Sequence, residues 1–363
     1  MPFGFLIIDF RFRGDLMESI HEILNEITSS KEGDVLATII HVEGSAYRRE
    51  GTSMLFKGNG KEVGLLSAGC LEADLLYRVE ETRVRKTPQT VIYDMSAEDD
   101  LTWGNGAGCN GIITILLEPI DDRMFNLLTK LKTYLLNGTS VSMMKILSDD
   151  RNEVETLFFV DEKTYFGKCN EQKFDQIKSA LNELHYTNQK SGLLTIEPLE
   201  TNSYLHTFHP KPRLFVFGAG KDAIPLVKLA SLAGFFVTIS DWRADLCSYE
   251  FFPDAEQILV GFPSEIIPRL QLTASDSAII ITHQFQKDKE ILNHILNINL
   301  KYLGVLGGKK RIQRLLDGKK VDTVINSPAG LQIGAEGPEE IAISIVGELI
   351  QRQRIKKISK HEE

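Results

Sequence analysis

The chain has 363 residues, of which 42% are hydrophobic and 25% are charged, and it carries a formal net charge of −9 at pH 7. These values are typical of a soluble globular protein with room for two domains. The excess of acidic residues argues against a broad nucleic-acid-binding surface, because such a surface needs a stripe of basic residues to displace counterions. No apolar run reaches the length of a membrane span.

The four cysteines show no C-x-x-C spacing. The sequence therefore predicts neither a zinc site nor a disulfide framework, and this usage favours a reducing cytoplasm. Residues 1–16 hold a short apolar stretch with no basic residues before it, which does not match a signal peptide. We interpret them as an extension upstream of an amphipathic helix that begins at Met17.

The first half of the chain has the pattern of an α+β domain. Periodicity predicts two helices, at about 17–30 and 71–86. It predicts four strands, at 35–40, 54–56, 90–95 and 112–117. Residues 121–200 alternate between helical and extended patterns and contain no chemical motif.

Two cysteines in the first half stand in glycine-rich sequence, at positions 70 and 109. Gly69 precedes Cys70, and Glu72 follows it in the first turn of the predicted helix. Cys70 is therefore near the helix N-terminus, where the helix dipole stabilises a thiolate. Cys109 lies in Gly-Ala-Gly-Cys-Asn-Gly. Because glycine has no side chain, such turns can present a thiol to a ligand, and this suits metal ligation or sulfur handling. The alternative is that both cysteines are small buried core residues.

Two arginines occupy a loop between Gly44 and Gly51. The guanidinium groups of Arg48 and Arg49 are planar forks that can clamp a phosphate. A solvated pair of loop arginines is the alternative.

A different pattern begins at Arg213. A buried strand leads into the turn Gly218-Ala219-Gly220-Lys221-Asp222-Ala223, and a helix and a second strand follow, ending at Asp241. Asp241 comes 21 residues after Gly220 (from 220 to 241), the spacing of a dinucleotide-binding βαβ unit. We therefore predict a Rossmann-like, doubly wound parallel sheet.

Other elements complete this half. Further strands are expected at 278–282 and 302–306, and a last helix at about 338–353. The polar segment 201–212 contains two prolines and is predicted to be a linker. The predicted domains are therefore 1–203 and 204–363.

Several residues of the Rossmann half are candidate ligand contacts. The glycine turn at Gly218 and Gly220 allows a pyrophosphate to approach the helix N-terminus, as in NAD or another nucleotide. Lys221 can reach a phosphate, and Asp241 can accept hydrogen bonds from ribose. His283 ends a strand at the carboxyl edge of the sheet, where such folds bind ligands. The alternatives are a capping histidine and a domain that has lost its nucleotide.

Taken in order, these motifs resemble the xanthine dehydrogenase accessory factor family (XdhC/CoxI-like). In the first half the matching stretches are Gly44-Ser45…Arg48-Arg49…Gly51…Met54, Ala68-Gly69-Cys70-Leu71-Glu72 and Gly108-Cys109-Asn110-Gly111. In the second half they are 217–220, Asp241-Trp242-Arg243, Thr282-His283, 302–307 and the long stretch 327–342. The chain departs from the family pattern at Glu50, where proline is usual, and at Lys221, where histidine is usual.

The resemblance implies a cofactor-binding chaperone rather than an enzyme. Such a protein binds molybdenum cofactor (molybdopterin) and helps deliver its sulfurated form to a molybdenum hydroxylase, xanthine dehydrogenase, in purine catabolism. By the same resemblance Cys70 is the candidate molybdenum ligand and Cys109 the second cofactor contact. A cysteine desulfurase is an implied partner, and a homodimer the implied state. The alternatives are an NAD-dependent oxidoreductase and a docking protein that only joins the subunits of a dehydrogenase.

Overall fold

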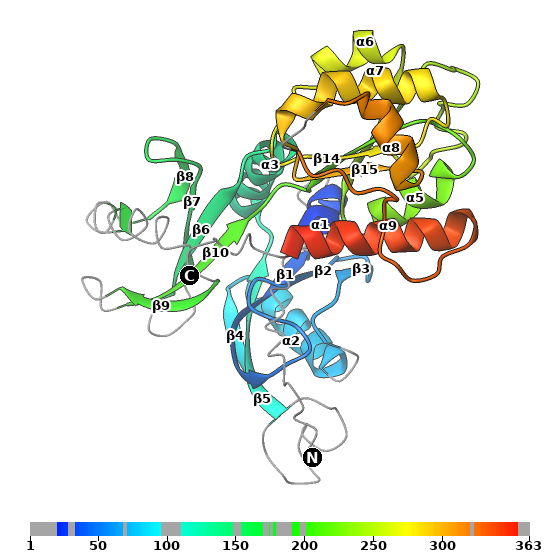
Figure 1. Ribbon diagram of the computed structural model, residues 1–363. Helices are drawn as coiled ribbons and strands as arrows, with labels where there is room; N and C mark the ends of the chain where they lie inside the picture. The colour runs from blue at the N-terminus through cyan, green and yellow to red at the C-terminus, as the bar shows by residue number, and fades with distance from the viewer. Residues whose placement is uncertain are drawn as a thin grey trace, which may run out of the picture. The chain divides into compact units, whose positions relative to one another are not determined.

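The computed structural model describes residues 20–27, 33–67, 71–95, 110–147, 154–169, 174, 177–178, 191–196, 201–319 and 323–354. The chain divides into two compact units on either side of Pro210 and Lys211. Three five-stranded sheets, A to C, organise the described residues (Figure 1). Sheets A and B belong to the first unit and sheet C to the second.

Sheet A is antiparallel, with the strand order β3-β2-β1-β5-β4. Its strands are β1 (Val35–Ser45), β2 (Ser53–Phe56), β3 (Glu62–Gly64), β4 (Gln89–Asp94) and β5 (Asn110–Pro119). The first six residues of β1 are all buried, because both faces of the sheet are covered. Leu36 and Ile40 face one hydrophobic core, whereas Val35, Ala37 and Ile39 face another.

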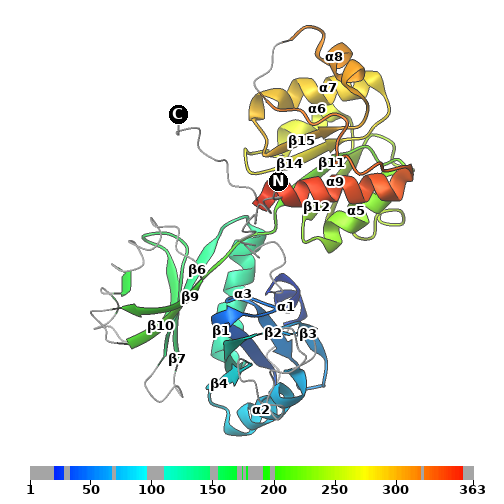
Figure 2. The ribbon, with the colours of Figure 1, turned by 60° about the horizontal axis from the view of Figure 1, so that its bottom comes forward.

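Three helices supply these covering layers. They are α1 (Ile20–Glu26), α2 (Glu72–Arg85) and α3 (Asp122–Leu136). Leu75 and Val79 of α2 pack on one face of sheet A. Leucines of α3 and isoleucines of α1 share a core with the other face and with sheet B, so α3 lies between the two sheets (Figure 2).

Sheet B is also antiparallel and has the order β8-β7-β6-β10-β9. Its strands are β6 (Val141–Leu147), β7 (Val154–Phe159), β8 (Tyr165–Lys168), β9 (Gly192–Ile196) and β10 (Thr201–Phe208). The face turned away from α3 has a small core of its own, which includes Met144, Leu157 and Leu205.

The prediction of a linker at 201–212 is wrong. Residues 201–208 form β10, a central strand that pairs with both β6 and β9. The residues from Ser203 to Leu205 are buried, because cores lie on both faces of the sheet. The two prolines that suggested a linker come only after the strand, at 210 and 212.

Sheet C is parallel, with the order β13-β12-β11-β14-β15. Its strands are β11 (Arg213–Phe217), β12 (Phe236–Asp241), β13 (Gln257–Val260), β14 (Ser277–Ile280) and β15 (Tyr302–Val305). Because β12 and β14 flank β11 on opposite sides, the chain reverses its direction of winding at the end of β11. In folds of this type ligands bind at that point.

Helices cover both faces of sheet C. They are α5 (Ala223–Leu232), α6 (Pro263–Ile266), α7 (Phe285–Ile295), α8 (Lys309–Leu316) and α9 (Gly337–Arg354). Short 3₁₀ turns, Ile267–Arg269 and Leu296–Ile298, follow α6 and α7. Helices α5 and α9 pack on one face, and α7 and α8 on the other (Figure 1). The predicted fold class, an α+β part followed by a Rossmann-like parallel sheet, is confirmed.

Candidate functional site

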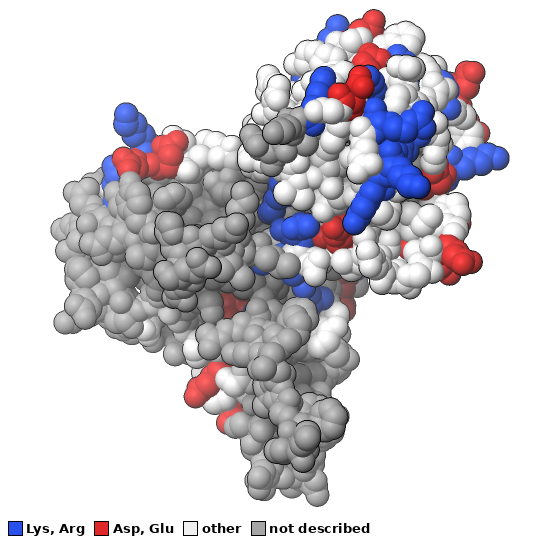
Figure 3. All heavy atoms as spheres, in the orientation of Figure 1, with Lys and Arg blue, Asp and Glu red and all other residues white. Residues whose placement is uncertain are grey.

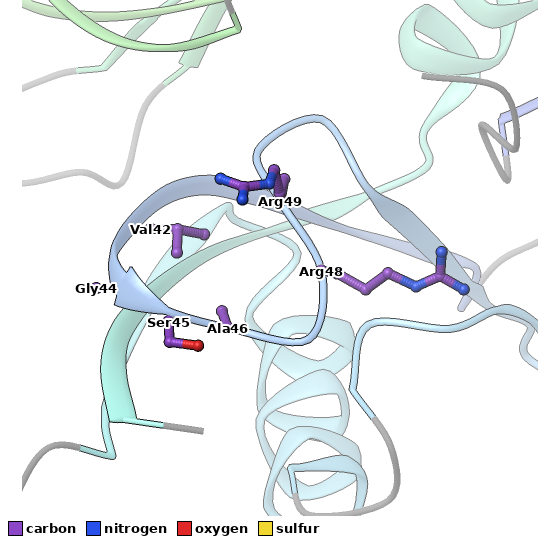
Figure 4. A pocket seen from close by; sticks show the side chains of 6 residues that line it. All are labelled: Val42, Gly44, Ser45, Ala46, Arg48 and Arg49. Carbon is purple, nitrogen blue, oxygen red and sulfur yellow. The ribbon is translucent and has the colours of Figure 1, made fainter. Parts of the chain in front are cut away.

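A small cavity lies beside the end of β1. Its volume is about 230 Å³. The lining residues are Val42, Gly44, Ser45, Ala46, Arg48 and Arg49 (Figure 4). The backbone closes tightly here, because Ser45 pairs with Asn110 at the start of β5. A side chain on Gly111 would lie 2.3 Å from the carbonyl oxygen of Glu43, so glycine is required for this close pairing.

The two predicted arginines both line this cavity. Arg48 is half-buried, and its Nε atom is buried without a hydrogen-bond partner among the described residues. The Arg48 guanidinium also lies over the ring of Tyr47, 5.4 Å from its centroid. Arg49 is exposed, and the two guanidinium groups point in different directions (Figure 4). Arg48 therefore offers an unused donor next to the cavity, while Arg49 is free to turn towards a ligand.

Two contacts fix the position of the loop that carries the arginines. The Val42 N–H donates to the Glu50 carboxylate at 3.0 Å, which gives Glu50 a local structural role. Gly51 has a φ of +94°, and a Cβ there would lie 2.3 Å from the imidazole of His206 on β10. The loop of sheet A thus rests directly on a buried side chain of sheet B.

The predicted cysteine ligands lie outside the described residues, and so does Gly69. The described residue after Cys70 is Leu71, which is buried and packs in the same core as Ile113 of β5. Glu72 opens α2, as predicted. Of the cysteines that are described, Cys169 is half-buried, and burial raises the pKa of Cys247 to about 11. A thiol with that pKa is a poor metal ligand.

The turn after β11 has the predicted Rossmann geometry. Gly218 has a φ of +120°, and a Cβ there would lie 2.5 Å from the carbonyl oxygen of Ile281, so only glycine fits. The turn leads into α5, and Lys221 is exposed at its tip. His283 follows β14 and meets this turn, because its Nε2 lies 2.5 Å from Oδ2 of Asp222. The structure therefore brings Gly218, Lys221 and His283 together at one edge of sheet C.

Asp241 ends β12 at the same edge, but its carboxylate is already engaged. It accepts a hydrogen bond from the Ala219 N–H at 2.7 Å and two from the Arg243 guanidinium, at 2.9 and 2.7 Å. Burial opposes ionisation of Asp241, but these hydrogen bonds outweigh it and hold its pKa below the usual value. Asp241 thus anchors the turn, and its contact with ribose stays a prediction.

Two residues at this edge were not among the predicted contacts. Asp222 stands between the glycine turn and α5, and Arg243 stands two positions after the strand-ending acid. The signal for Asp222 was visible in the sequence, because a charged residue stands two positions after the second glycine of the turn, directly before the helix. Nothing in the spacing indicated that Arg243 would bind Asp241 itself.

Basic side chains gather over α8, at the end of sheet C formed by β15 (Figure 3). The helix follows β15 through Gly307 and Gly308, and it carries Lys309, Lys310, Arg311 and Arg314. Arg311 donates to the buried Asp288 at 2.5 Å. Within the described part of the chain, Lys309 and Lys310 form no ion pair.

The two groups of residues belong to different compact units: the arginine cavity to the first, the glycine turn to the second. Across the described residues, no cluster of three or more His, Cys, Asp or Glu side chains is placed to hold a metal ion. None of the described helices is long and apolar enough to cross a bilayer.

Comparison with known proteins covers both units. Residues 28–94 match the XdhC and CoxI family, residues 122–209 match the BH1974-like central domain, and residues 214–349 match the XdhC Rossmann domain. A Bacillus subtilis protein described as a probable subunit of xanthine dehydrogenase is 40% identical over 93% of this chain and 98% of its own length. The chain belongs to the XdhC and CoxI family.

Two further relatives of this XdhC/CoxI chain extend the comparison. The molybdenum cofactor insertion chaperone PaoD of Escherichia coli is 20% identical over 89% of this chain and 85% of its own length. A crystal structure described as a xanthine dehydrogenase from Bacillus halodurans superposes with a TM-score of 0.81 at 43% identity. That match covers 95% of this chain and 98% of the other.

Proposed function

We propose that this chain is an accessory factor of a molybdenum hydroxylase of the xanthine dehydrogenase type. It binds molybdenum cofactor and hands over the sulfurated form to the hydroxylase. Membership of the XdhC and CoxI family supports this proposal, as does the similarity to a cofactor insertion chaperone. The cofactor is cargo, so the chain needs to hold and release it rather than to catalyse a reaction.

The observation that carries the proposal is the cavity beside β1. The phosphate of the cofactor is its most negative group, and the buried Nε of Arg48 lacks a partner among the described residues there. Guanidinium groups bind phosphate through charge-assisted hydrogen bonds. A volume of about 230 Å³ is below the roughly 300–1,000 Å³ of sites that enclose a whole small molecule. We therefore assign only the phosphate end of the cofactor to this cavity.

The molybdenum end is assigned to cysteine. Cys70 is the proposed ligand and Cys109 the second contact, because a thiolate is a soft donor suited to such a centre. Each cysteine is next in sequence to a residue that packs against sheet A or pairs within it, and sheet A carries the cavity. Cys70 precedes Leu71, which packs in the core of sheet A, and Cys109 precedes Asn110, which pairs with Ser45.

The test is retention of cofactor by the full chain. Wild-type protein is incubated anaerobically with molybdenum cofactor and desalted, and bound molybdenum and pterin are measured by metal analysis and fluorescence. Cys70→Ala is expected to lower retention about tenfold or more, corresponding to about 1.4 kcal/mol of lost binding free energy. Cys169→Ser is the matched control, because Cys169 is half-buried and lies outside the proposed site. Equal retention by wild type and Cys70→Ala would contradict the assignment.

A second candidate function is supported by the glycine turn. The Rossmann unit has the strand order and turn of a dinucleotide-binding domain, which is compatible with an NAD-dependent oxidoreductase. Incubation of the same protein with NAD separates the two candidates. Retention of NAD with hydride transfer, and no retention of molybdenum cofactor, would favour the oxidoreductase.

A further inference from the structure

The position that a phosphate would take at the Rossmann turn is occupied by a side chain of the protein. In dinucleotide-binding turns the second glycine leaves space for the pyrophosphate to approach the backbone. In this chain a Cβ on Gly220 would lie 2.5 Å from Oδ1 of Asp222. The Asp222 carboxylate thus fills the space that the missing side chain of Gly220 leaves open.

The same carboxylate lies where a bound anion is favoured. Asp222 is the N-cap residue of α5, a helix of ten residues, and its side chain makes no capping hydrogen bond. Negative charge at a helix N-terminus is stabilised by the helix dipole and by the exposed N–H groups. The Asp222 carboxylate therefore takes the electrostatic role that a phosphate would otherwise take.

His283 holds the carboxylate in this place. Its Nε2 lies 2.5 Å from Oδ2 of Asp222, and this contact joins the turn after β11 to the end of β14. The His283 backbone has a φ of +60°, a left-handed conformation that is uncommon for a residue other than glycine. Strained residues of this kind concentrate at ligand sites. The His283 side chain is 60% exposed and that of Asp222 25%, so a ligand can reach the pair from solvent.

The surroundings remain suited to an anion. Lys221 is exposed beside the turn, and the basic side chains of α8 lie at the end of sheet C formed by β15 (Figure 3). We propose that Asp222, held by His283, is the specificity-determining residue of this turn. Its carboxylate competes with the phosphate groups of a nucleotide ligand, and such a ligand binds only after the Asp222–His283 contact opens.

The test compares a ligand that has phosphate groups with one that has none. ADP-ribose and adenosine are titrated calorimetrically into the full-length wild type, Asp222→Asn and Asp222→Ala. Both variants are expected to bind ADP-ribose at least about tenfold more tightly than wild type, about 1.4 kcal/mol. Adenosine affinity is expected to be unchanged, because adenosine carries no charge that Asp222 would repel.

Asp254→Asn is the matched control, because it removes the same charge from an exposed position of the same unit. It is expected to bind ADP-ribose as wild type does. Equal ADP-ribose affinity of wild type and Asp222→Asn would overturn the proposal, and so would absence of binding by every variant with unchanged circular dichroism. The inference does not depend on the proposed cofactor function. Retention of molybdenum cofactor is tested through Cys70, so either idea can fail alone.

Discussion

At the scale of single residues, His206 links the two sheets of the first unit. Its imidazole lies under Gly51 of the arginine loop, 4.5 Å from the ring centroid of Phe208. The Nδ1 atom lies 2.7 Å from Oγ of Ser191. Burial, aided by the charge of His209, lowers the pKa of His206 from 6.5 to about 3. His206 is therefore neutral in the folded protein near pH 7.

This shift predicts loss of stability in mild acid. Between pH 6.5 and about 3 the unfolded chain binds a proton at His206 and the folded chain does not. The free energy of unfolding therefore falls as the pH falls, by roughly 2–3 kcal/mol between about pH 6.5 and pH 4.5 from this residue alone. Urea unfolding followed by circular dichroism measures the loss. His206→Phe keeps an aromatic ring and should weaken the pH dependence by that amount.

Carboxylates also titrate in this range, so a control is needed. His294 is exposed on α7, and His294→Asn should show the same pH dependence as wild type. If His206→Phe lost stability with falling pH as steeply as wild type does, the burial of a neutral His206 would not be the cause.

At the scale of elements, a buried ion pair connects sheet A to sheet B. Nζ of Lys145 on β6 lies 2.6 and 2.7 Å from the carboxylate oxygens of Glu118 on β5. Each side chain is only 2% exposed. Removing one charge from such a pair leaves the other uncompensated in a medium of low dielectric, which costs about 3–5 kcal/mol.

Lys145→Met is therefore expected to lower the free energy of unfolding by about 3–5 kcal/mol, measured by urea denaturation. The double variant Lys145→Met, Glu118→Leu should recover most of this loss, because it buries no unpaired charge. A double variant as unstable as the single one would show that packing around Lys145, rather than its charge, is what matters.

Local patterns predicted several of the helices and strands, mainly those outside residues 121–200. Four of the five parallel strands of sheet C are short apolar runs, and the structure places them within one or two residues of their predicted bounds. The fifth, β13, was not predicted. Strand β10 was missed because it begins with Thr201, Asn202 and Ser203, polar residues typical of loops. What makes it a strand is pairing with β6 and β9 and burial on both faces, and no local pattern contains that information.

The candidate site was likewise predicted only in part. Residue type and loop position indicated Arg48, Arg49 and His283, and the structure places the arginines at a cavity and His283 at the turn. The contact between His283 and Asp222 joins residues 61 positions apart in the sequence. Spacing rules describe single βαβ units, so they could not predict a hydrogen bond between side chains of two different units.

At the scale of the whole molecule, each hydrophobic core formed by the described residues is built from one unit. The two cores of sheet C contain residues between 214 and 350, and the three other cores contain residues between 20 and 208. A domain with its own core is expected to fold alone when the chain is cut in a segment that few contacts cross. Residues 209–212 join β10 to β11, and the division between the two units falls within them.

We therefore expect the fragments 18–210 and 211–363 to fold when they are expressed separately. Each should show a cooperative urea transition by circular dichroism, and the sum of their spectra should match that of the full chain. A cut after residue 203 is the control, because it separates Tyr204 and Phe208 from the first unit. Loss of one such buried aromatic side chain lowers the free energy of unfolding by about 3–5 kcal/mol. The free energy of unfolding of a whole domain is only about 5–15 kcal/mol. The fragment 18–203 should therefore unfold or aggregate. If 18–203 folded and 18–210 did not, the domain boundary would lie inside β10 instead.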